Sequence, residues 1–403
     1  MLERKTVLIR YDEIGLKGRN RKYFVKCLLK NIKRALSHLE NIHFSSPRGR
    51  IFLYIPSSIS LECSTILKTI PGISSFSIGV SLNPDFDLIS DLAVKWIESK
   101  LDSVKSLKFC VKTRRSNKSF PNTSQEVNLE VGSRIMKILS RRGLTVNIKE
   151  AEYVFEIELG RSETVVFDNR EPGLCGLPVG SSGNVLCMLS GGIDSPVSAF
   201  MMACRGCRVH FVFFDNQPFL GRGGYDKVLS LAKKINKIQT RGILYVVPFQ
   251  EVQVAIRDHC NEENRVVLYR RMMYRIADEI AKGQRYMALV TGESLSQVAS
   301  QTLENLAAVS CITSLSVFRP LIGMNKESII TRAKKIGTYD VSIEPQPDCC
   351  SIFMPKNPVT RSKVRFWKEM RKKSPGKNYR MMLLIEWKSS NSMIYSVGDI
   401  FLT

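Results

Sequence analysis

The stretch Val185-Leu-Cys-Met-Leu189, followed by Ser190-Gly-Gly-Ile-Asp-Ser195 and Pro196, decides the fold of the largest part of the chain. The apolar residues predict a buried strand, the two glycines a tight turn, and Pro196 the first turn of a helix. Backbone N–H groups at such a strand–turn–helix junction face an anion, and the helix dipole favours negative charge there. The stretch therefore predicts a phosphate-binding loop.

The polar side chains of this loop suit a nucleotide. Ser190 and Ser195 supply hydroxyl donors, and Asp194 can help to hold a magnesium ion. The lysine of the GxxxxGK[ST] phosphate loop is absent, which excludes that class of nucleotide-binding protein.

The residues that follow the loop alternate between buried strands and helices. Short apolar runs recur at 209–214, 243–247 and 286–290, with helical stretches between them. This alternation predicts a doubly wound parallel sheet, an α/β fold, over 185–403. Before it, residues 169–184 are rich in Gly, Pro and Ser and are expected to form a linker.

Upstream of the linker, the pattern changes to two smaller α+β units, expected at 1–59 and 60–168. Lys5–Arg10 and 107–112 have the character of strands, and each is followed by a basic, turn-rich segment and a helix. The basic side chains of these segments are candidates for RNA contacts: Lys17, Arg19, Arg21, Lys22, Lys112, Arg114, Arg115 and Lys118.

The overall charge points to a polyanionic partner. The 403 residues contain 60 Lys and Arg against 37 Asp and Glu, a formal net charge of +23. Cations that neutralise nucleic-acid phosphates release condensed counterions, so such an excess favours nucleic-acid binding. A hydrophobic content of 44% fits globular domains, and no apolar run long enough to span a membrane or to act as a secretion signal is found. We expect a cytoplasmic protein with reduced thiols and no membrane association.

Two adjacent cysteines form a second candidate for chemistry. Cys349 and Cys350 follow Glu344-Pro-Gln-Pro-Asp348, a proline-rich segment that predicts a loop. Loops present side chains to reactants, and the thiolate is the reactive form of cysteine.

Ser190-Gly-Gly-Ile-Asp-Ser195 resembles the pyrophosphate loop of the PP-loop ATP pyrophosphatases, and the surrounding segments resemble the tRNA 4-thiouridine synthetases. These segments extend in order over nearly the whole chain: Ile9–Phe24, Gly176–Gly183, Ser195–Ala199, Tyr269–Ala277, Thr291–Thr302, Arg319–Lys326 and Ile336–Tyr339.

The resemblance implies three domains: a ferredoxin-like domain, an RNA-binding THUMP domain and a PP-loop domain. It also implies that ATP and Mg²⁺ serve to adenylate O4 of the uridine at position 8 of tRNA. Sulfur then replaces that oxygen to give 4-thiouridine, with release of AMP and pyrophosphate. The nucleotide contacts it implies are Met188, Leu189, Ser190, Gly191, Gly192, Asp194, Ser195, Phe213, Phe214, Arg270, Gly292 and Gln301. Phe213 stands where many relatives carry histidine.

The candidate catalytic residues have three expected roles, of which sulfur transfer is the one that the resemblance implies. Asp194 is expected to bind the metal, Lys326 to stabilise phosphate charge, and Cys350, in preference to Cys349, to transfer sulfur. Longer members carry a rhodanese-like domain, and the roughly 50 residues after Cys350 are too few for one. We therefore expect sulfur from a separate cysteine desulfurase, and a role in thiamine thiazole synthesis is less favoured.

Three questions stay open on the sequence. A lysidine-type PP-loop ligase is one alternative, although the cysteine pair disfavours it. A non-catalytic tRNA-binding protein is another, disfavoured by the intact loop. A homodimer is left open as the oligomeric state.

Overall fold

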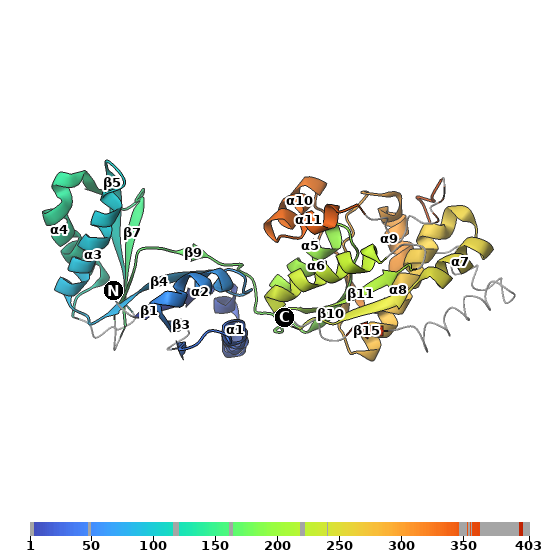
Figure 1. Ribbon diagram of the computed structural model, residues 1–403, viewed down its shortest axis with the longest axis horizontal. Coiled ribbons are helices and arrows are strands. Elements are labelled where there is room, and N and C mark those ends of the chain that lie inside the picture. Colours follow the sequence, from blue (N-terminus) through green and yellow to red (C-terminus); the bar gives the residue numbers. More distant parts are fainter. Residues whose placement is uncertain are drawn as a thin grey trace. The chain divides into compact units, whose positions relative to one another are not determined.

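The computed structural model describes residues 4–46, 50–115, 121–160, 164–217, 222–239, 241–345, 353, 355 and 357–362, and the backbone of 395–397. The chain divides into two compact units, Met1–Gly176 and Leu177–Thr403, each built on its own sheet (Figure 1). Among the described residues, no helix has both the length and the apolarity to cross a bilayer.

The first unit begins with a small sheet covered by helices. Its central strand is β1, which pairs antiparallel with β3 on one side and with β4 on the other. Leu28 and Ile32 are buried on the inner face of helix α1. The elements are β1 (Arg4–Arg10), η1 (Glu13–Leu16), η2 (Gly18–Asn20), α1 (Arg21–Ala35), β2 (His43–Ser45), β3 (Ile51–Pro56), η4 (Ser57–Ile59), α2 (Ser60–Leu67) and β4 (Ser75–Leu82).

The rest of the first unit extends the same sheet. Strand β4 pairs with β8, so one sheet runs in the order β2-β3-β1-β4-β8-β7-β5-β6, with β9 also on β4. Thr123 and Glu126 form a capping box that begins α4. The elements are α3 (Phe86–Leu101), β5 (Leu107–Arg115), α4 (Ser124–Leu139), η5 (Ser140–Arg142), β6 (Leu144–Val146), β7 (Tyr153–Leu159), β8 (Thr164–Phe167) and β9 (Glu171–Pro172). The two expected α+β modules thus share a sheet, and their boundary at 59/60 stays a prediction.

The second unit is a doubly wound sheet, as the sequence predicts. Its strand order is β14-β13-β10-β11-β12-β15; the first five strands are parallel and β15 is antiparallel. The elements are β10 (Asn184–Met188), α5 (Asp194–Cys204), β11 (Arg208–Asp215), α6 (Gly223–Gln239), β12 (Leu244–Pro248), α7 (Gln250–His259), η6 (Glu262–Asn264), α8 (Arg265–Gly283), β13 (Ala288–Val290), η7 (Ala299–Gln301), α9 (Leu303–Ser310), β14 (Ser316–Phe318), α10 (Lys326–Lys335), α11 (Tyr339–Ile343) and β15 (Tyr395–Val397).

Both faces of this sheet are buried, because helices cover each of them. Along β11, Val212 and Phe214 pack into the core on the side of α7 and α8, whereas Phe211 and Phe213 pack into the core on the side of α6. Successive side chains of a strand point to opposite faces, so a strand buried on both sides has to be apolar throughout. The carboxyl ends of β10 and β11 therefore lie on a rigid base.

Candidate functional site

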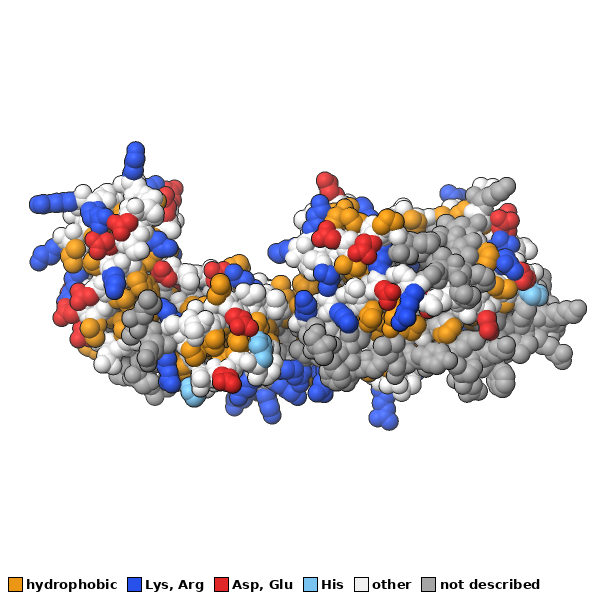
Figure 2. All heavy atoms as spheres, in the orientation of Figure 1, with side chains coloured by type: hydrophobic (Ala, Val, Ile, Leu, Met, Phe, Trp, Pro, Cys, Tyr) orange, Lys and Arg blue, Asp and Glu red, His pale blue; other side chains and the backbone are white. Residues whose placement is uncertain are grey.

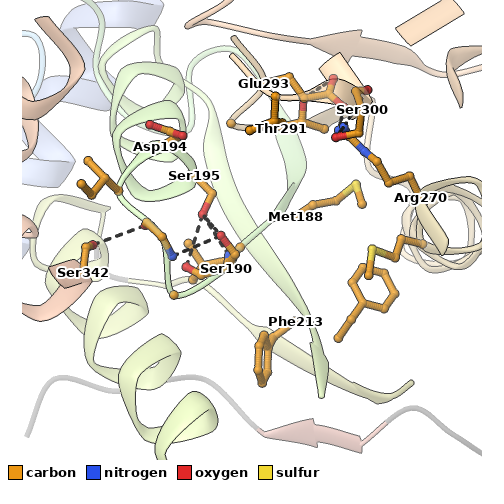
Figure 3. A pocket seen from close by; sticks show the side chains of 18 of the residues that line it. Met188, Ser190, Asp194, Ser195, Phe213, Arg270, Thr291, Glu293, Ser300 and Ser342 are labelled. Carbon is orange, nitrogen blue, oxygen red and sulfur yellow. Dashed lines mark hydrogen bonds and ion pairs between the residues drawn. The ribbon is translucent and has the colours of Figure 1, made fainter. Parts of the chain in front are cut away.

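The glycine-rich loop lies where the sequence expects it, between β10 and α5. Its two serines contact each other: their hydroxyl oxygens are 3.1 Å apart, and the backbone N–H of Ser190 donates to Ser195 Oγ over 2.9 Å (Figure 3). The N–H of Gly192 donates to Ser190 Oγ over 3.3 Å. Both hydroxyls thus shape the loop itself, and helix α5 starts directly behind it at Asp194.

A cavity of about 890 Å³ opens in front of this loop. Its size is in the range of nucleotide and cofactor sites. All the nucleotide contacts expected from the sequence line it, and so does Lys326: Met188, Leu189, Ser190, Gly191, Gly192, Asp194, Ser195, Phe213, Phe214, Arg270, Gly292, Gln301 and Lys326. Segments far apart in the sequence therefore meet at the carboxyl ends of the parallel strands, where ligands bind in open α/β sheets.

Asp194 joins two walls of the cavity. Its Oδ1 is 2.6 Å from Lys326 Nζ at the start of α10, and its Oδ2 accepts a hydrogen bond from Gln297 Nε2 over 3.1 Å. Sequence reasoning expected both Asp194 and Lys326 in the site, but it did not find their pairing or Gln297.

Arg270 reaches the cavity from α8. Its Nη1 donates to the carbonyl and the hydroxyl of Ser300, over 3.1 Å and 3.0 Å, and its Nη2 contacts the carboxylate of Glu293. Sequence reasoning missed Glu293, although it lies in the segment Thr291–Thr302 that carries the resemblance. A carboxylate next to Gly292 was the available signal.

Gly292 is required by a close approach of backbone to backbone. A Cβ atom there would lie 2.6 Å from the N atom of Ser195 and 2.8 Å from its Cα. The turn after β13 therefore presses on the start of α5, and only glycine leaves room for it.

The carboxyl end of β11 brings aromatic and acidic groups to the cavity. Phe213 and Phe214 are mostly buried in the two cores, with 7% and 4% of their surfaces exposed, so packing is their main contact within the chain. Asp215 follows them, and desolvation by burial raises the pKa of its carboxyl group.

Helix α11 rests on the loop, a contact that sequence reasoning missed. Ser342 Oγ donates to the carbonyl of Gly192 over 3.3 Å, and the buried Lys227 donates from Nζ to the carbonyl of Glu344 over 2.7 Å. Cys349 and Cys350, which follow Glu344 in the sequence, lie outside the described residues.

Among the described cysteines, Cys187 lies next to the loop, in β10. It is fully buried, and desolvation raises the pKa of its thiol to about 12. Since the thiolate is the nucleophilic form, Cys187 is an inert core residue.

A second, basic cavity of about 320 Å³ lies in the first unit. Of the predicted RNA-binding residues, Arg21 and Arg114 line it. Sequence reasoning missed three further arginines that line it as well, Arg10, Arg50 and Arg170.

The arginines of this cavity are held by hydrogen bonds and ion pairs. Arg10 donates to Glu156 over 2.9 Å and to Ser77 over 2.8 Å, while Arg50 pairs with the buried Glu158. Desolvation by burial lowers the pKa of Arg10 to about 10, against the opposing effect of Glu156. Arg21 donates to the hydroxyl of Tyr11 over 3.0 Å.

The other predicted RNA-binding residues lie outside the cavity. Arg19 and Lys22 are exposed in η2 and at the start of α1, and Lys17 Nζ lies 5.3 Å from the ring centroid of Phe24. Figure 2 shows Lys and Arg side chains gathered around α1. Lys112 is exposed on β5, and Arg115 donates to the carbonyl of Asn122 over 2.8 Å. Lys118 lies outside the described residues.

The glycine-rich loop of this chain lies between a parallel strand and a helix, lacks a lysine, and faces a cavity large enough for a nucleotide. This combination indicates a PP-loop nucleotide-binding protein. Three segments match known families: residues 6–77 the ThiI ferredoxin-like domain, 83–167 the THUMP domain, and 180–375 the family described as Thiamine biosynthesis protein (ThiI).

Relatives and solved structures agree with this assignment. The chain is 39% identical over 363 residues to a probable tRNA sulfurtransferase of Halothermothrix orenii, covering 89% of this chain and 91% of the relative. It is 38% identical over 359 residues to that of Brevibacillus brevis, covering 89% of each. Its fold is similar to a crystal structure of a 4-thiouridine synthetase–RNA complex with bound ATP: the TM-score is 0.86 and the identity 32%, over 97% of this chain and 99% of that chain.

The chain belongs to the tRNA sulfurtransferase (ThiI) family. The resemblance seen in the sequence, the three kinds of domain and the class of transferase are thereby confirmed. Family membership also favours sulfur transfer over the lysidine-type ligase and the non-catalytic alternative.

Proposed function

We propose that the chain uses ATP to convert the uridine at position 8 of tRNA into 4-thiouridine. The observation that carries this proposal is the cavity at the glycine-rich loop, where every nucleotide contact expected from the sequence comes together. Family membership supports tRNA as the sulfur acceptor, and the RNA and ATP named for the similar synthetase structure support both ligands.

In the first step, O4 of the uridine attacks the α-phosphorus of ATP while N3 of the uridine loses its proton to water. The bond from that phosphorus to the bridging oxygen breaks, pyrophosphate leaves, and the uridine carries AMP on O4. The backbone of Ser190–Gly192 and the start of α5 hold the phosphates, and Arg270 and Lys326 stabilise their charge. Adenylation turns a poor leaving group into AMP.

Mg²⁺ would neutralise charge on the phosphates during this step. Among the described residues, no cluster of three or more His, Cys, Asp or Glu side chains could bind a metal by itself. This fits Mg²⁺, which commonly uses one or two carboxylates together with phosphate oxygens and water. Asp194, placed at the loop, is the residue that would hold it.

In the second step, sulfur replaces AMP at C4. The terminal sulfur of a cysteine persulfide attacks C4 and expels AMP; a second thiol then attacks the sulfur of the cysteine, which releases 4-thiouridine and leaves a disulfide. A thiol reductant restores the two thiols. We assign the persulfide to Cys350 in preference to Cys349, and the lining residues Glu344 and Pro345 lead into this segment.

The partners follow from this chemistry. A separate cysteine desulfurase supplies the persulfide, and the chain works in the cytoplasm, where its tRNA is. The exposed lysines and arginines of α1 and the basic cavity contact tRNA phosphates. These contacts suit a folded RNA, whose duplexes are recognised mainly by shape and backbone.

Separating the two steps tests the proposal. Cys350→Ser keeps the size of the side chain but lacks a thiolate, so it should retain tRNA-dependent release of pyrophosphate and lose thiolation when desulfurase and cysteine are the sulfur source. Cys349→Ser is the matched control and should thiolate. The reverse pattern would exchange the roles of the two cysteines, and thiolation by both variants would dismiss the covalent route.

A further inference from the structure

A buried carboxylate lies in the wall of the nucleotide cavity. Glu293 follows Gly292 in the turn after β13, and only 2% of its surface is exposed. Burying a carboxylate is costly unless charged partners and hydrogen bonds compensate for the lost water. None of the steps proposed above uses this residue.

Glu293 is held by four side chains. It pairs with Arg270 through Oε1 and with Arg319 through Oε2, the latter over 2.5 Å. The hydroxyl of Tyr274 donates to it over 3.0 Å. The hydroxyl of Thr291 also donates to it over 3.0 Å (Figure 3). With these donors around it, the carboxylate has a fixed position and is suited to orient other groups.

The two arginines differ in what they face. Their side chains are similarly buried, with 15% exposed for Arg270 and 17% for Arg319. Arg270 lines the nucleotide cavity, whereas Arg319 does not and instead donates to Ser310 Oγ over 2.7 Å. The carboxylate of Glu293 therefore pairs with one arginine that lines the cavity and with one that lies outside it.

Arg270 also determines the position of a second cavity wall. Its Nη1 atom holds both the carbonyl and the hydroxyl of Ser300, and the neighbouring Gln301 lines the cavity. A guanidinium group fixed at one end by Glu293 can therefore present a defined edge to a phosphate and hold the turn of η7 in place.

We infer that Glu293 is a positioning residue of the nucleotide site, which acts on ATP through Arg270. It orients the guanidinium group before the ligand arrives, so that little of the binding free energy is used to order that side chain. The inference rests on the proposal that this cavity binds ATP.

The test is a double-mutant cycle in the full-length chain, read as the Kd for ATP with Mg²⁺ and as the Tm. Glu293→Gln, which keeps the shape and removes the charge, should weaken ATP binding about tenfold in the wild-type background. In the Arg270→Ala background the same change should alter the Kd by less than about twofold, because the residue that transmits the effect is absent.

Arg319→Gln is the matched control. It removes the other guanidinium partner of the same carboxylate, so it should lower the Tm but change the Kd for ATP by less than about twofold. A general loss of structure would instead weaken ATP binding equally in Arg270→Ala and in Arg319→Gln. That result would overturn the inference. Equal or tighter ATP binding by Glu293→Gln would overturn it as well.

Two further measurements keep the test decisive. If Glu293→Gln does not fold, Glu293→Asp retains the charge with a shorter reach; about tenfold weaker ATP binding supports the inference and wild-type binding overturns it. The wild-type chain is titrated with ATP first. If it does not bind ATP, the proposed function fails; if it binds and the Glu293 variants bind equally well, only the positioning role fails.

Discussion

At the scale of single residues, Asp194 connects the loop to the opposite wall of the cavity. Its two carboxylate oxygens are held by Lys326 and Gln297, which come from segments far along the chain. The same carboxylate is the one proposed to hold Mg²⁺. Asp194 is therefore the residue at which the proposed phosphate site can be probed without changing the basic residues of the first unit.

Asp194→Asn should slow tRNA-dependent AMP formation about 100-fold or more, because the variant loses the charge that attracts the metal and Lys326. The affinity for tRNA should stay within about twofold, since the basic residues lie elsewhere. The rate is measured as AMP formed over time, and the affinity for tRNA is measured by filter binding. Asp340→Asn, an exposed change on α11, is the control. AMP formation at the wild-type rate by Asp194→Asn would refute the assignment of the loop.

Cys187 gives a prediction about pH. Burial raises the pKa of its thiol from 9.0 to about 12, so the folded chain keeps this proton where the unfolded chain loses it. The buried, protonated thiol makes its full contribution to the free energy of unfolding below the pKa of the unfolded chain. This contribution is lost as pH rises from about 9 towards 12. Urea unfolding should therefore show the stability difference between wild type and Cys187→Ala narrowing above about pH 9. A constant difference up to about pH 10.5 would contradict the burial of this thiol.

At the scale of elements, the loop and the sheet are predictable because their signals are local. The apolar strand, the glycines and the proline at 185–196 follow one another, and strand β11 is apolar on both faces. The pairing of β4 with β8 and the edge strand β15 join segments far apart, and no local pattern indicates them. Glu293 and Lys227 were missed for a different reason: a charged residue in a helix or turn is usually solvated, so neither was expected to be buried.

Gly292 tests how β13 and α5 fit together. Gly292→Ala would place a Cβ atom 2.6 Å from the backbone N of Ser195, so the loop or the turn has to move. We expect a loss of about 1–3 kcal/mol in the free energy of unfolding, together with weaker ATP binding. Gly283→Ala is the control, because a Cβ atom added there would meet no atom within 4 Å apart from neighbouring backbone of its own helix. Its effect on the free energy of unfolding should be neutral or slightly stabilising. Wild-type ATP binding by Gly292→Ala would mean that the close approach of Gly292 to Ser195 does not shape the loop.

At the scale of the whole molecule, the basic side chains behind the net charge of +23 gather at particular places and are not spread evenly. The first unit combines an exposed basic helix α1 with a cavity lined by five arginines, whereas the second unit carries the nucleotide cavity. The sequence predicted Arg21 and Arg114 as RNA contacts but not Arg10, Arg50 and Arg170, because only the shared sheet brings the segments at β1, β3 and β9 close to β5. The proposed binding of RNA and the proposed activation of the uridine therefore fall to different units.

Replacing Arg114, Arg115 and Lys118 together with Ala should weaken tRNA binding and reduce the slope of log K against log salt. The expected reduction is about 0.7–0.9 for each tRNA phosphate that is no longer neutralised by a protein cation. Lys95, Lys100 and Lys137 are exposed on α3 and α4 and, replaced together, remove the same charge as a control. An equal change in slope for both triple variants would indicate a general effect of charge, and an unchanged slope in the first would place the RNA elsewhere.

The most direct measurement of the central claim is mass spectrometry of the oligonucleotides that a nuclease releases from tRNA after a reconstituted reaction. The purified chain is incubated with unmodified tRNA, ATP, Mg²⁺, a cysteine desulfurase, cysteine and a thiol reductant. The account predicts that 4-thiouridine appears at position 8, that AMP forms with it in equal amounts, and that omitting ATP abolishes both products. AMP formation without any thiolated uridine, or thiolation that proceeds without ATP, would contradict it.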